Sequence, residues 1–270
     1  MHPMLTIAVR AARAAGKILV KNFGVEADLN IQAKSQNDFV SEIDKAAEAA
    51  IIGAIRKNYP DHSIIAEESG TTAGAESEHE WIIDPLDGTT NYLRGIPHFA
   101  ISIAYRVKGV VQVAVVYDPL REDLFTAVKG GGAQLNGKRL RVKAKRDLDG
   151  ALLATGFPFK RKALSDVYLA VFADLFEDVA DMRRAGAAAL DLAYVAAGRV
   201  DGFFEFALQP WDMAAGALLV REAGGLVADF NGGHDFLSQG HIVAGNPKVV
   251  QALLTRARPH VKGTIPFSQS

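Results

Sequence analysis

The stretch WIIDPLDGTTNY, residues 81–92, carries more structural and chemical information than any other part of the chain. Its first three residues are apolar and predict a strand that ends at Asp84, and Pro85 and Gly88 then predict a tight turn. Together the strand and the turn place Asp84 and Asp87 at one mouth of a sheet. Two carboxylates held this close together are costly unless a proton or a cation neutralises them.

The residues of this turn favour a magnesium site next to a bound phosphate. Carboxylate oxygens suit Mg²⁺, and the ion keeps water molecules that a substrate phosphate can replace. Directly after the second aspartate, Gly88, Thr89 and Thr90 offer backbone N–H groups and hydroxyls that can bind an anion. The pattern therefore predicts metal-assisted chemistry on a phosphate. The competing interpretation is an acidic turn that only caps a helix.

The stretch resembles the D-P-[IL]-D-G-T-[TS]-N signature of the inositol monophosphatase family, which belongs to the lithium-sensitive, Mg²⁺-dependent sugar and inositol phosphatases. Other segments resemble further family motifs in the right order: KSQNDFVSEID at 34–44, IIAEESG at 64–70, RRAGAAALD at 183–191 and WDMAAGALLVREAGG at 211–225. The resemblance covers nearly the whole chain and favours the bacterial type of inositol-1-monophosphatase.

The resemblance implies a metal site built from residues far apart in the sequence. In the family, the first glutamate of the G-E-E-S motif binds metal, and the aspartate of the W-D motif binds metal and contacts the substrate. The implied ligands for two to three Mg²⁺ per subunit are Glu67, Asp84, the Leu86 carbonyl, Asp87 and Asp212. By residue chemistry alone, Glu67 could also lie in a solvated loop, and Asp212 could cap a helix.

The resemblance also implies how the water and the substrate are held. The predicted catalytic residues are Asp44 and Thr89, which orient the attacking water, and Glu67. The predicted substrate contacts are Asp87, Gly88, Thr89, Arg183, Gly186, Ala188, Glu205 and Asp212. Asp44 can at the same time form a capping box with Ser41. Without a cysteine in the chain, and with no histidine inside the acidic motifs, a metal-activated water is the economical nucleophile for this slow hydrolysis.

Two positions leave questions open. Ala187 stands where the family commonly has serine or threonine, so a hydroxyl that could contact the substrate or cap a helix is missing. Lys34 matches the lysine of its motif but is equally well read as an ordinary surface lysine. The missing hydroxyl at Ala187 bears on which phosphate ester the protein prefers.

Composition fits a soluble enzyme. The chain has 270 residues, 49% of them hydrophobic, and a net charge of −1, which gives no overall attraction to nucleic acid or membranes. It has no cysteine, which excludes disulfides and thiolate metal sites. No apolar run is long enough to span a membrane, and basic residues interrupt the first helix, so we expect a cytoplasmic protein without a signal peptide.

Periodicity predicts one compact unit with two lobes. Residues 1–147 read as helices on an antiparallel-rich sheet and carry most metal ligands, whereas 148–270 read as α/β and carry Asp212 and the substrate contacts. The predicted helices are 4–23, 41–58, 165–177, 187–197, 211–223 and 246–257. The predicted strands are 63–66, 79–84, 98–107, 110–117, 122–127, 151–155, 202–206 and 241–244. The family resemblance implies an α+β and α/β fold, the layered α-β-α-β-α sandwich of the sugar phosphatases, with the metals between the lobes.

The family resemblance implies Mg²⁺-dependent, Li⁺-sensitive hydrolysis of inositol 1-phosphate by a homodimer. One alternative is another small phosphomonoester, because the scaffold also serves for fructose 1,6-bisphosphate, nucleotide 3′-phosphates and histidinol phosphate. A second alternative is transcription antitermination through protein partners, with which bacterial members are associated. One compatible feature is a row of cations, Arg139, Arg141, Lys143 and Lys145, which would form one face of a strand. A solvated strand edge explains that row more simply.

Overall fold

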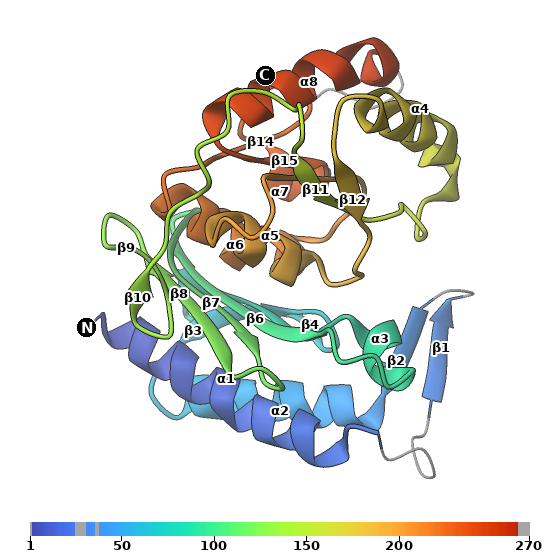
Figure 1. Ribbon diagram of the computed structural model, residues 1–270. Coiled ribbons are helices and arrows are strands. Elements are labelled where there is room, and N and C mark those ends of the chain that lie inside the picture. The colour runs from blue at the N-terminus through green and yellow to red at the C-terminus, as the bar shows by residue number, and fades with distance from the viewer. Residues whose placement is uncertain (1, 25–30, 36–37, 264–270) are drawn as a thin grey trace.

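The computed structural model describes residues 2–24, 31–35 and 38–263, and for 31–35 and 38–41 it describes the backbone alone. Figure 1 shows five stacked layers in the order helices, sheet, helices, sheet, helices. This is the α-β-α-β-α sandwich, so the expected fold is confirmed. Three hydrophobic cores fill the spaces between the layers.

An eight-stranded sheet in the order β10-β9-β8-β7-β6-β5-β3-β4 forms the second layer. Its strands are β3 (His62–Ala66), β4 (Gly70–Thr72), β5 (Glu76–Asp87), β6 (Ala100–Val107), β7 (Val110–Asp118), β8 (Asp123–Val128), β9 (Gly132–Leu135) and β10 (Lys138–Arg139). β3 and β5 are parallel, and the other neighbouring strands are antiparallel. The parallel pair brings the carboxyl ends of β3 and β5 to the same edge of the sheet.

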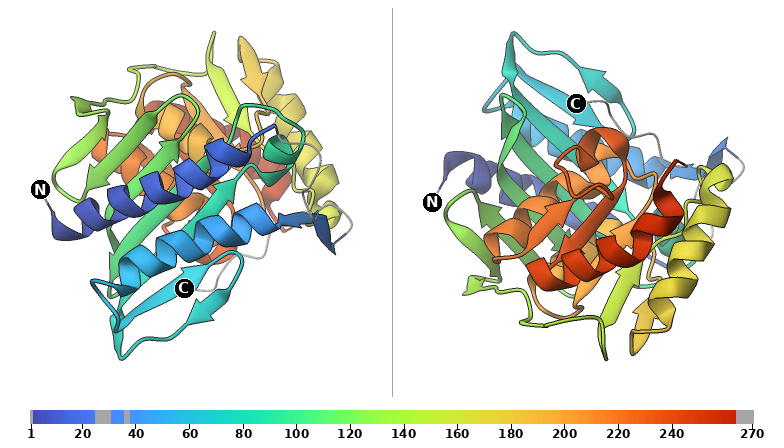
Figure 2. Two further views of the ribbon diagram at one scale, coloured as in Figure 1. Left: turned by 90° about the horizontal axis from the view of Figure 1, so that it is seen from below. Right: turned by 90° about the horizontal axis from the view of Figure 1, so that it is seen from above.

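Two long helices, α1 (Pro3–Asn22) and α2 (Glu42–Arg56), cover one face of this sheet side by side (Figure 2, left). The buried stripe of α1 is mostly alanine, which lets the helix approach the strands closely. β1 (Ile31–Ser35) and β2 (Asp38–Ser41) form a small hairpin just before α2. The short helix α3 (Thr89–Leu93) follows β5 directly.

The middle layer contains α5 (Ala188–Ala196) and α6 (Pro210–Glu222), which lie between the two sheets (Figure 1). From Met213 to Val220 every residue of α6 is buried, because sheets cover the helix on opposite sides. A Cβ at Gly216 would lie 2.5 Å from the Cβ of Leu192, so only glycine permits this distance between α6 and α5. The middle layer therefore fixes the start of α6 against the first sheet.

The second sheet has the order β12-β11-β13-β15-β14 and mixes parallel and antiparallel pairs. Its strands are β11 (Leu152–Thr155), β12 (Asp181–Arg183), β13 (Gly202–Glu205), β14 (Leu226–Ala228) and β15 (Ile242–Gly245). The outermost layer consists of α4 (Ser165–Phe176) and α8 (Pro247–Val261), side by side in Figure 2 (right). Two short pieces complete the chain, η1 (Lys162–Leu164) and α7 (Phe236–Gln239).

Each helix and strand expected from the sequence is present, with ends that agree or differ by at most four residues. Lys108 and Gly109 connect β6 and β7, and both have positive φ, as a tight hairpin requires. The expectations missed the short elements β1, β2, β4, β9, β10, β12, β14, α3, α7 and η1. No helix in the described part of the chain is both long and apolar enough to cross a membrane.

Candidate active site

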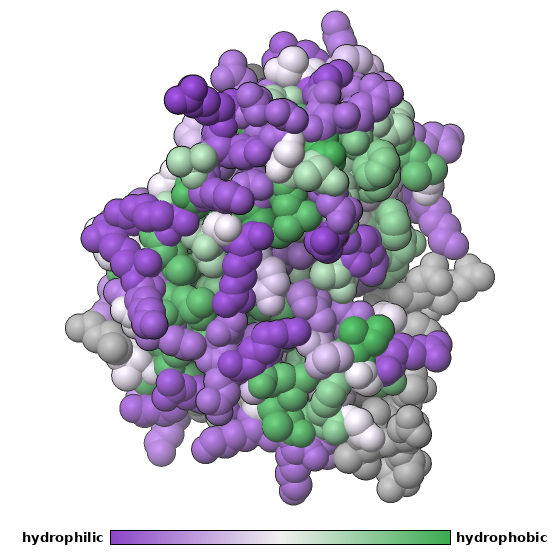
Figure 3. Space-filling model, viewed as in Figure 1, coloured by the Kyte–Doolittle hydropathy of each residue, from purple (hydrophilic) through white to green (hydrophobic). Residues whose placement is uncertain are grey.

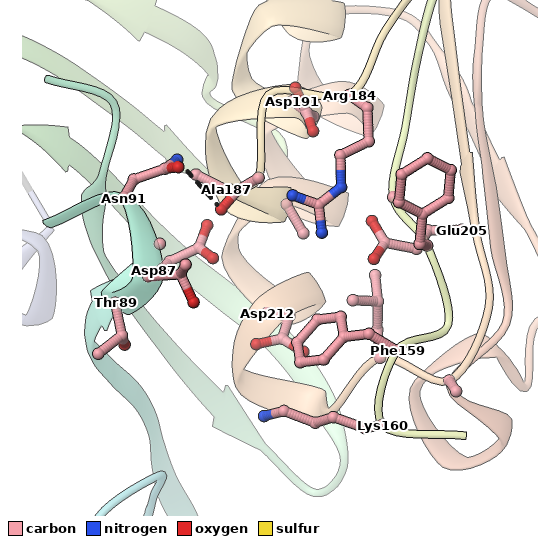
Figure 4. Close-up of a pocket in the computed structure, with 18 of the residues that line it drawn as sticks. Asp87, Thr89, Asn91, Phe159, Lys160, Arg184, Ala187, Asp191, Glu205 and Asp212 are labelled. Atoms are coloured by element: carbon pink, nitrogen blue, oxygen red, sulfur yellow. Dashed lines mark hydrogen bonds between the residues drawn. The ribbon is translucent and has the colours of Figure 1, made fainter. Parts of the chain in front are cut away.

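A cavity of about 390 Å³ lies where the carboxyl end of β5 faces the second sheet and α5 (Figure 4). Both halves of the chain line it. The lining residues are Glu67, Asp84, Leu86–Asn91, Thr155–Lys160, Arg184, Gly186–Ala188, Asp191, Glu205–Leu208 and Asp212. Most of the predicted site residues are among them, although they are scattered over more than half of the sequence.

Three aspartates form the acidic centre of this cavity. Asp84 and Asp87 end β5, and Asp212 lies in the first turn of α6. Each offers one carboxylate oxygen, and these oxygens lie within 4.8 Å of one another. Glu67 reaches the same cavity because it follows β3, which is parallel to β5 and pairs Ala66 with Ile83.

Backbone N–H groups fix one oxygen of each of the three aspartates. Asp84 Oδ1 accepts from the N–H of Leu86 at 2.9 Å, which closes the tight turn. Asp87 Oδ2 accepts from the N–H of Ala189, at the start of α5, at 2.7 Å. Asp212 Oδ2 accepts from the N–H of Gln209 at 2.7 Å. The orientation of each carboxylate is therefore set before any ligand binds.

The acidic centre is electrostatically strained without a cation. Burial is the largest cause that raises the pKa of Asp84 well above its usual value, and the charges of Glu67 and Asp87 add to it. Burial and the charge of Asp212 likewise raise the pKa of Asp87, against hydrogen bonds from α5 that lower it. A bound divalent cation removes this penalty by replacing like-charge repulsion with attraction.

The oxygen-only donor set fits Mg²⁺. Hard carboxylate and carbonyl oxygens are the ligands this ion takes, and the cavity contains no sulfur or imidazole ligand among the described residues. The Leu86 carbonyl accepts a hydrogen bond from Thr89 Oγ1 at 3.0 Å and keeps a second lone pair for a metal. The set that could hold the metal is thus Glu67, Asp84, the Leu86 carbonyl, Asp87 and Asp212.

The residues predicted to orient water lie at different depths. Thr89 lines the cavity at the start of α3, and Gly88 before it has φ +97°, which favours glycine. Asp44 is buried on α2 and does not line the cavity, but its charge is close enough to raise the pKa of Asp84. The Ser41 and Lys34 side chains lie outside the described residues, so the capping box and the role of Lys34 stay predictions.

The opposite wall of the cavity contains a second acidic pair. Glu205 ends β13, and Asp191 lies in the first turn of α5. Burial is the main cause that raises the pKa of both carboxyls well above their usual values. Figure 4 shows the Arg184 guanidinium pointing into the cavity between them, and its charge opposes these rises.

The structure places Arg184, rather than Arg183, in the cavity. The strand β12 ends at Arg183, whose exposed guanidinium pairs with Asp181 on the same short edge strand. Arg184 turns the other way, and its guanidinium lies over the ring of Phe157 at 5.2 Å. Arg183, predicted as a substrate contact, thus lies away from the lining residues.

Gly186, Ala187 and Ala188 line the cavity between Arg184 and α5. The Asn91 side chain donates to the Ala185 carbonyl at 2.9 Å and so ties this segment to α3, the helix after β5. Ala187 is the residue before the first turn of α5 and provides no side-chain cap. The N–H group of the α5 start instead binds Asp87.

The sequence expectations missed the loop 156–160, which follows β11 and forms the rim of the cavity. Phe157 and Phe159 remain 46% and 38% exposed there, and Lys160 Nζ lies 3.8 Å from Glu67 Oε1. The position of this loop follows from strand pairing. β11 is parallel to β13, so the glycine- and proline-containing loop after β11 must lie at the same edge of the sheet as Glu205.

Comparison with known proteins agrees with this architecture. Residues 1–262 match the sequence model of the inositol monophosphatase family. "Nus factor SuhB" of Salmonella typhimurium is 60% identical over 265 residues, 98% of this chain and 99% of that protein, and its Escherichia coli K12 counterpart is 59% identical over the same shares.

Solved structures agree as well. The extragenic suppressor protein suhB of Bartonella henselae superimposes with a TM-score of 0.90 at 44% identity, covering 96% of this chain and 99% of the other. An inositol monophosphatase from Anabaena gives a TM-score of 0.85 at 39% identity, with 95% of each chain covered. On sequence and structure together, this chain belongs to the inositol monophosphatase family.

Proposed function

We propose that the protein is a Mg²⁺-dependent, Li⁺-sensitive phosphatase that hydrolyses inositol 1-phosphate to inositol and phosphate. The observation that carries the proposal is the convergence of Asp84, Asp87 and Asp212, whose carboxylate oxygens lie within 4.8 Å of one another. Such a cluster has a physical reason to exist when a cation neutralises it. When bound, Mg²⁺ supplies an activated water and neutralises charge on the phosphate.

Other groups of the cavity would bind the water, the phosphate and the polyol. The Thr89 hydroxyl donates a hydrogen bond to the Leu86 carbonyl, so its lone pairs are left to accept a hydrogen bond from the attacking water and orient it. The N–H groups of Gly88 and Thr89 bind phosphate oxygens at the start of α3. On the other wall, Glu205 accepts hydrogen bonds from the hydroxyls of the polyol, and Arg184 balances its charge.

The first experiment measures phosphate release from inositol 1-phosphate with and without Mg²⁺ and with added Li⁺, for the natural protein and Asp87→Asn. We expect Mg²⁺-dependent, Li⁺-inhibited release that Asp87→Asn lowers by a factor on the order of 10² or more, because an essential charge at the reacting centre is lost. Asp229→Asn is the matched control, since Asp229 is also buried but lies outside the cavity.

A substrate panel tests the choice of ester. Fructose 1,6-bisphosphate, nucleoside 3′-phosphates and histidinol phosphate should each be poorer substrates than inositol 1-phosphate. A folded, Mg²⁺-loaded protein that releases phosphate from none of them would overturn the catalytic assignment. A homodimer in the cytoplasm is part of the same proposal, and sedimentation of the purified protein tests the dimer.

A second candidate function is transcription antitermination through protein partners. Its support is the name "Nus factor SuhB" of the relatives and the row of cations after β9. Only Lys138 and Arg139 form a strand there, but the alternation continues, with Leu140 buried and Arg141 and Lys143 exposed. Figure 3 shows a largely hydrophilic surface on the side where β9 and β10 lie.

Charge reversal separates the two functions. The double variant Arg139→Glu, Arg141→Glu should lower readthrough of a ribosomal RNA terminator in cells that depend on this protein, and should leave phosphate release unchanged. The control reverses two other exposed cations, Lys17 and Lys57. Readthrough that survives the Arg139 and Arg141 changes would remove this surface from consideration, whereas survival in Asp87→Asn would show that readthrough does not need catalysis.

A further inference from the structure

Glu67 lies in a turn that has little packing of its own. Residues 67–69 connect β3 to β4, and Ala66 pairs with Gly70 across the turn. Gly70 has φ +74°, a left-handed conformation that favours glycine. β4 is the edge strand of the sheet, and each of its three residues is exposed. Core packing through β4 therefore cannot hold the turn in place.

The Glu67 N–H donates to the Ile83 carbonyl of β5 at 3.2 Å, and beyond that residue a buried carboxylate from α2 holds the turn. Glu48 is only 4% exposed, and its Oε2 and Oε1 accept from the N–H groups of Glu68 and Ser69, each at 2.9 Å. Both oxygens of one carboxylate thus bind two consecutive amides directly after Glu67. Hydrogen bonds to a charged acceptor are stronger than neutral ones and compensate the cost of burying the charge.

Helix α2 thereby connects two parts of the acidic centre. Asp44, one helical turn before Glu48, contributes to the electrostatics of Asp84. Glu48 reaches the turn of Glu67. The same helix packs on the first sheet through Ile51 and Ile55, so its position relative to β5 is fixed. Movement of the Glu67 turn relative to Asp84 would break both hydrogen bonds of Glu48.

We propose that Glu48 is a positioning residue for the metal site: it fixes the turn so that the Glu67 carboxylate stays within reach of the cation bound by Asp84. The inference rests on the proposed function, because the ligand role of Glu67 is itself part of that proposal. Residues that orient metal ligands typically change metal affinity by about 10- to 100-fold when they are lost.

The chemistry of the contact predicts a graded series. A carboxylate offers an acceptor to each amide, whereas the side chain of Glu48→Gln offers one acceptor and turns an NH₂ group toward the other amide. Glu48→Ala removes both hydrogen bonds. Mg²⁺ affinity, measured by calorimetric titration of the metal-free protein, should therefore fall about 10- to 100-fold in Glu48→Ala and by less in Glu48→Gln.

Amide hydrogen exchange gives a readout independent of the metal and of catalysis. In the metal-free protein, the amides of Glu68 and Ser69 should exchange slowly, faster in Glu48→Gln and fastest in Glu48→Ala. Loss of negative charge alone predicts a different result, in which both variants weaken Mg²⁺ binding equally and leave exchange unchanged. That result would overturn the positioning role.

The chain offers a matched control in Glu222, whose carboxylate also binds two N–H groups of a hairpin, those of Gly130 and Gly132, each at 2.8 Å. Glu222→Ala removes the same pair of bonds outside the cavity and should leave Mg²⁺ affinity unchanged. If Glu48→Ala does not fold, Glu48→Gln decides the question.

Two further outcomes keep the inference distinct from the proposed function. If the natural protein does not bind Mg²⁺, both are overturned together. If it binds Mg²⁺ and Glu67→Gln weakens binding while Glu48→Ala does not, the metal site stands and the positioning role of Glu48 is wrong.

Discussion

The two walls of the cavity are built in different ways. The wall at the end of β5 concentrates charge: Asp84 and Asp87 come from one short turn, and backbone N–H groups fix their carboxylates. The wall formed by the second sheet depends on shape. There, Gly156 lies against the Glu205 carboxylate, and Ala207 has φ +63°, an unusual backbone conformation for a residue other than glycine.

The difference lies in how each wall deals with its buried carboxylates. The first wall leaves its charge to be neutralised by a cation from solution, which suits a metal site. The second wall balances Glu205 and Asp191 only in part, with Arg184 of the chain itself. A change in shape should therefore damage the second wall more than the first, and two substitutions test this.

The larger effect, on stability and on the KM, is expected for Gly156→Ala. A Cβ at this position would lie 2.1 Å from Glu205 Oε1 and within 2.3 Å of two further atoms of that carboxyl group, so Glu205 has to move. Overpacking of this kind typically costs about 1–3 kcal/mol of stability. Because Glu205 is the proposed contact to the polyol, the KM for inositol 1-phosphate should rise while Mg²⁺ affinity stays near its natural value.

Gly53→Ala is the control for this experiment. Gly53 is an exposed residue inside α2, and nothing lies within 4 Å of an added Cβ. Alanine should stabilise the helix there by roughly 0.5–1 kcal/mol. Urea unfolding measures both stabilities. A Gly156→Ala protein that is as stable as the natural one and keeps its KM would show that the second wall adapts, which removes the contrast between the walls.

The same contrast explains what could be predicted from sequence. The first wall is local: WIIDPLDGTTNY contains a strand, a turn and two ligands in order, so its geometry follows from residue types. The place of Asp212 beside it was available only through family resemblance, because α6 brings it from a distant part of the chain. Helices and longer strands were likewise predictable, since apolar periodicity accumulates over several residues.

The second wall was less predictable for physical reasons. Arg183 and Arg184 are adjacent and chemically identical, and only the end of β12 decides which one faces the cavity. Strands of two or three residues, such as β4, β10 and β12, are too short for a periodic pattern. The parallel pairing of β3 with β5 depends on contacts between segments, although it is what places Glu67 beside Asp84.

A smaller effect, on the pH dependence of folding stability, is expected at His241, which supports the second wall. The N–H of Ala207 donates to His241 Nδ1 at 3.2 Å, so the ring is neutral with its proton on Nε2. Burial is the main cause that lowers the pKa of His241 to about 4; Arg161 lowers it further, and Asp229 opposes the change. The ring of Phe206 packs against it edge-on.

The sign of the effect follows from proton uptake. Below pH 6.5, the unfolded chain protonates this histidine and the folded protein does not, so stability falls as the pH drops toward about 4. Between pH 7 and pH 5.5 the loss from this group is about 1 kcal/mol. His241→Asn keeps an acceptor for the Ala207 N–H and does not titrate. Between pH 7 and pH 5.5 the stability of this variant should therefore fall by about 1 kcal/mol less than that of the natural protein.

Urea unfolding of both proteins at the two pH values measures this difference. The comparison with the variant is needed because His62 and His98 also have lowered pKa values and contribute to the slope of both proteins. Equal slopes of stability against pH would mean that folding does not lower the pKa of His241, so that the folded protein protonates the imidazole and loses the Ala207 hydrogen bond. A shallower slope in His241→Asn would instead establish that a neutral, buried side chain maintains the shape of the second wall, while the first wall depends on charge.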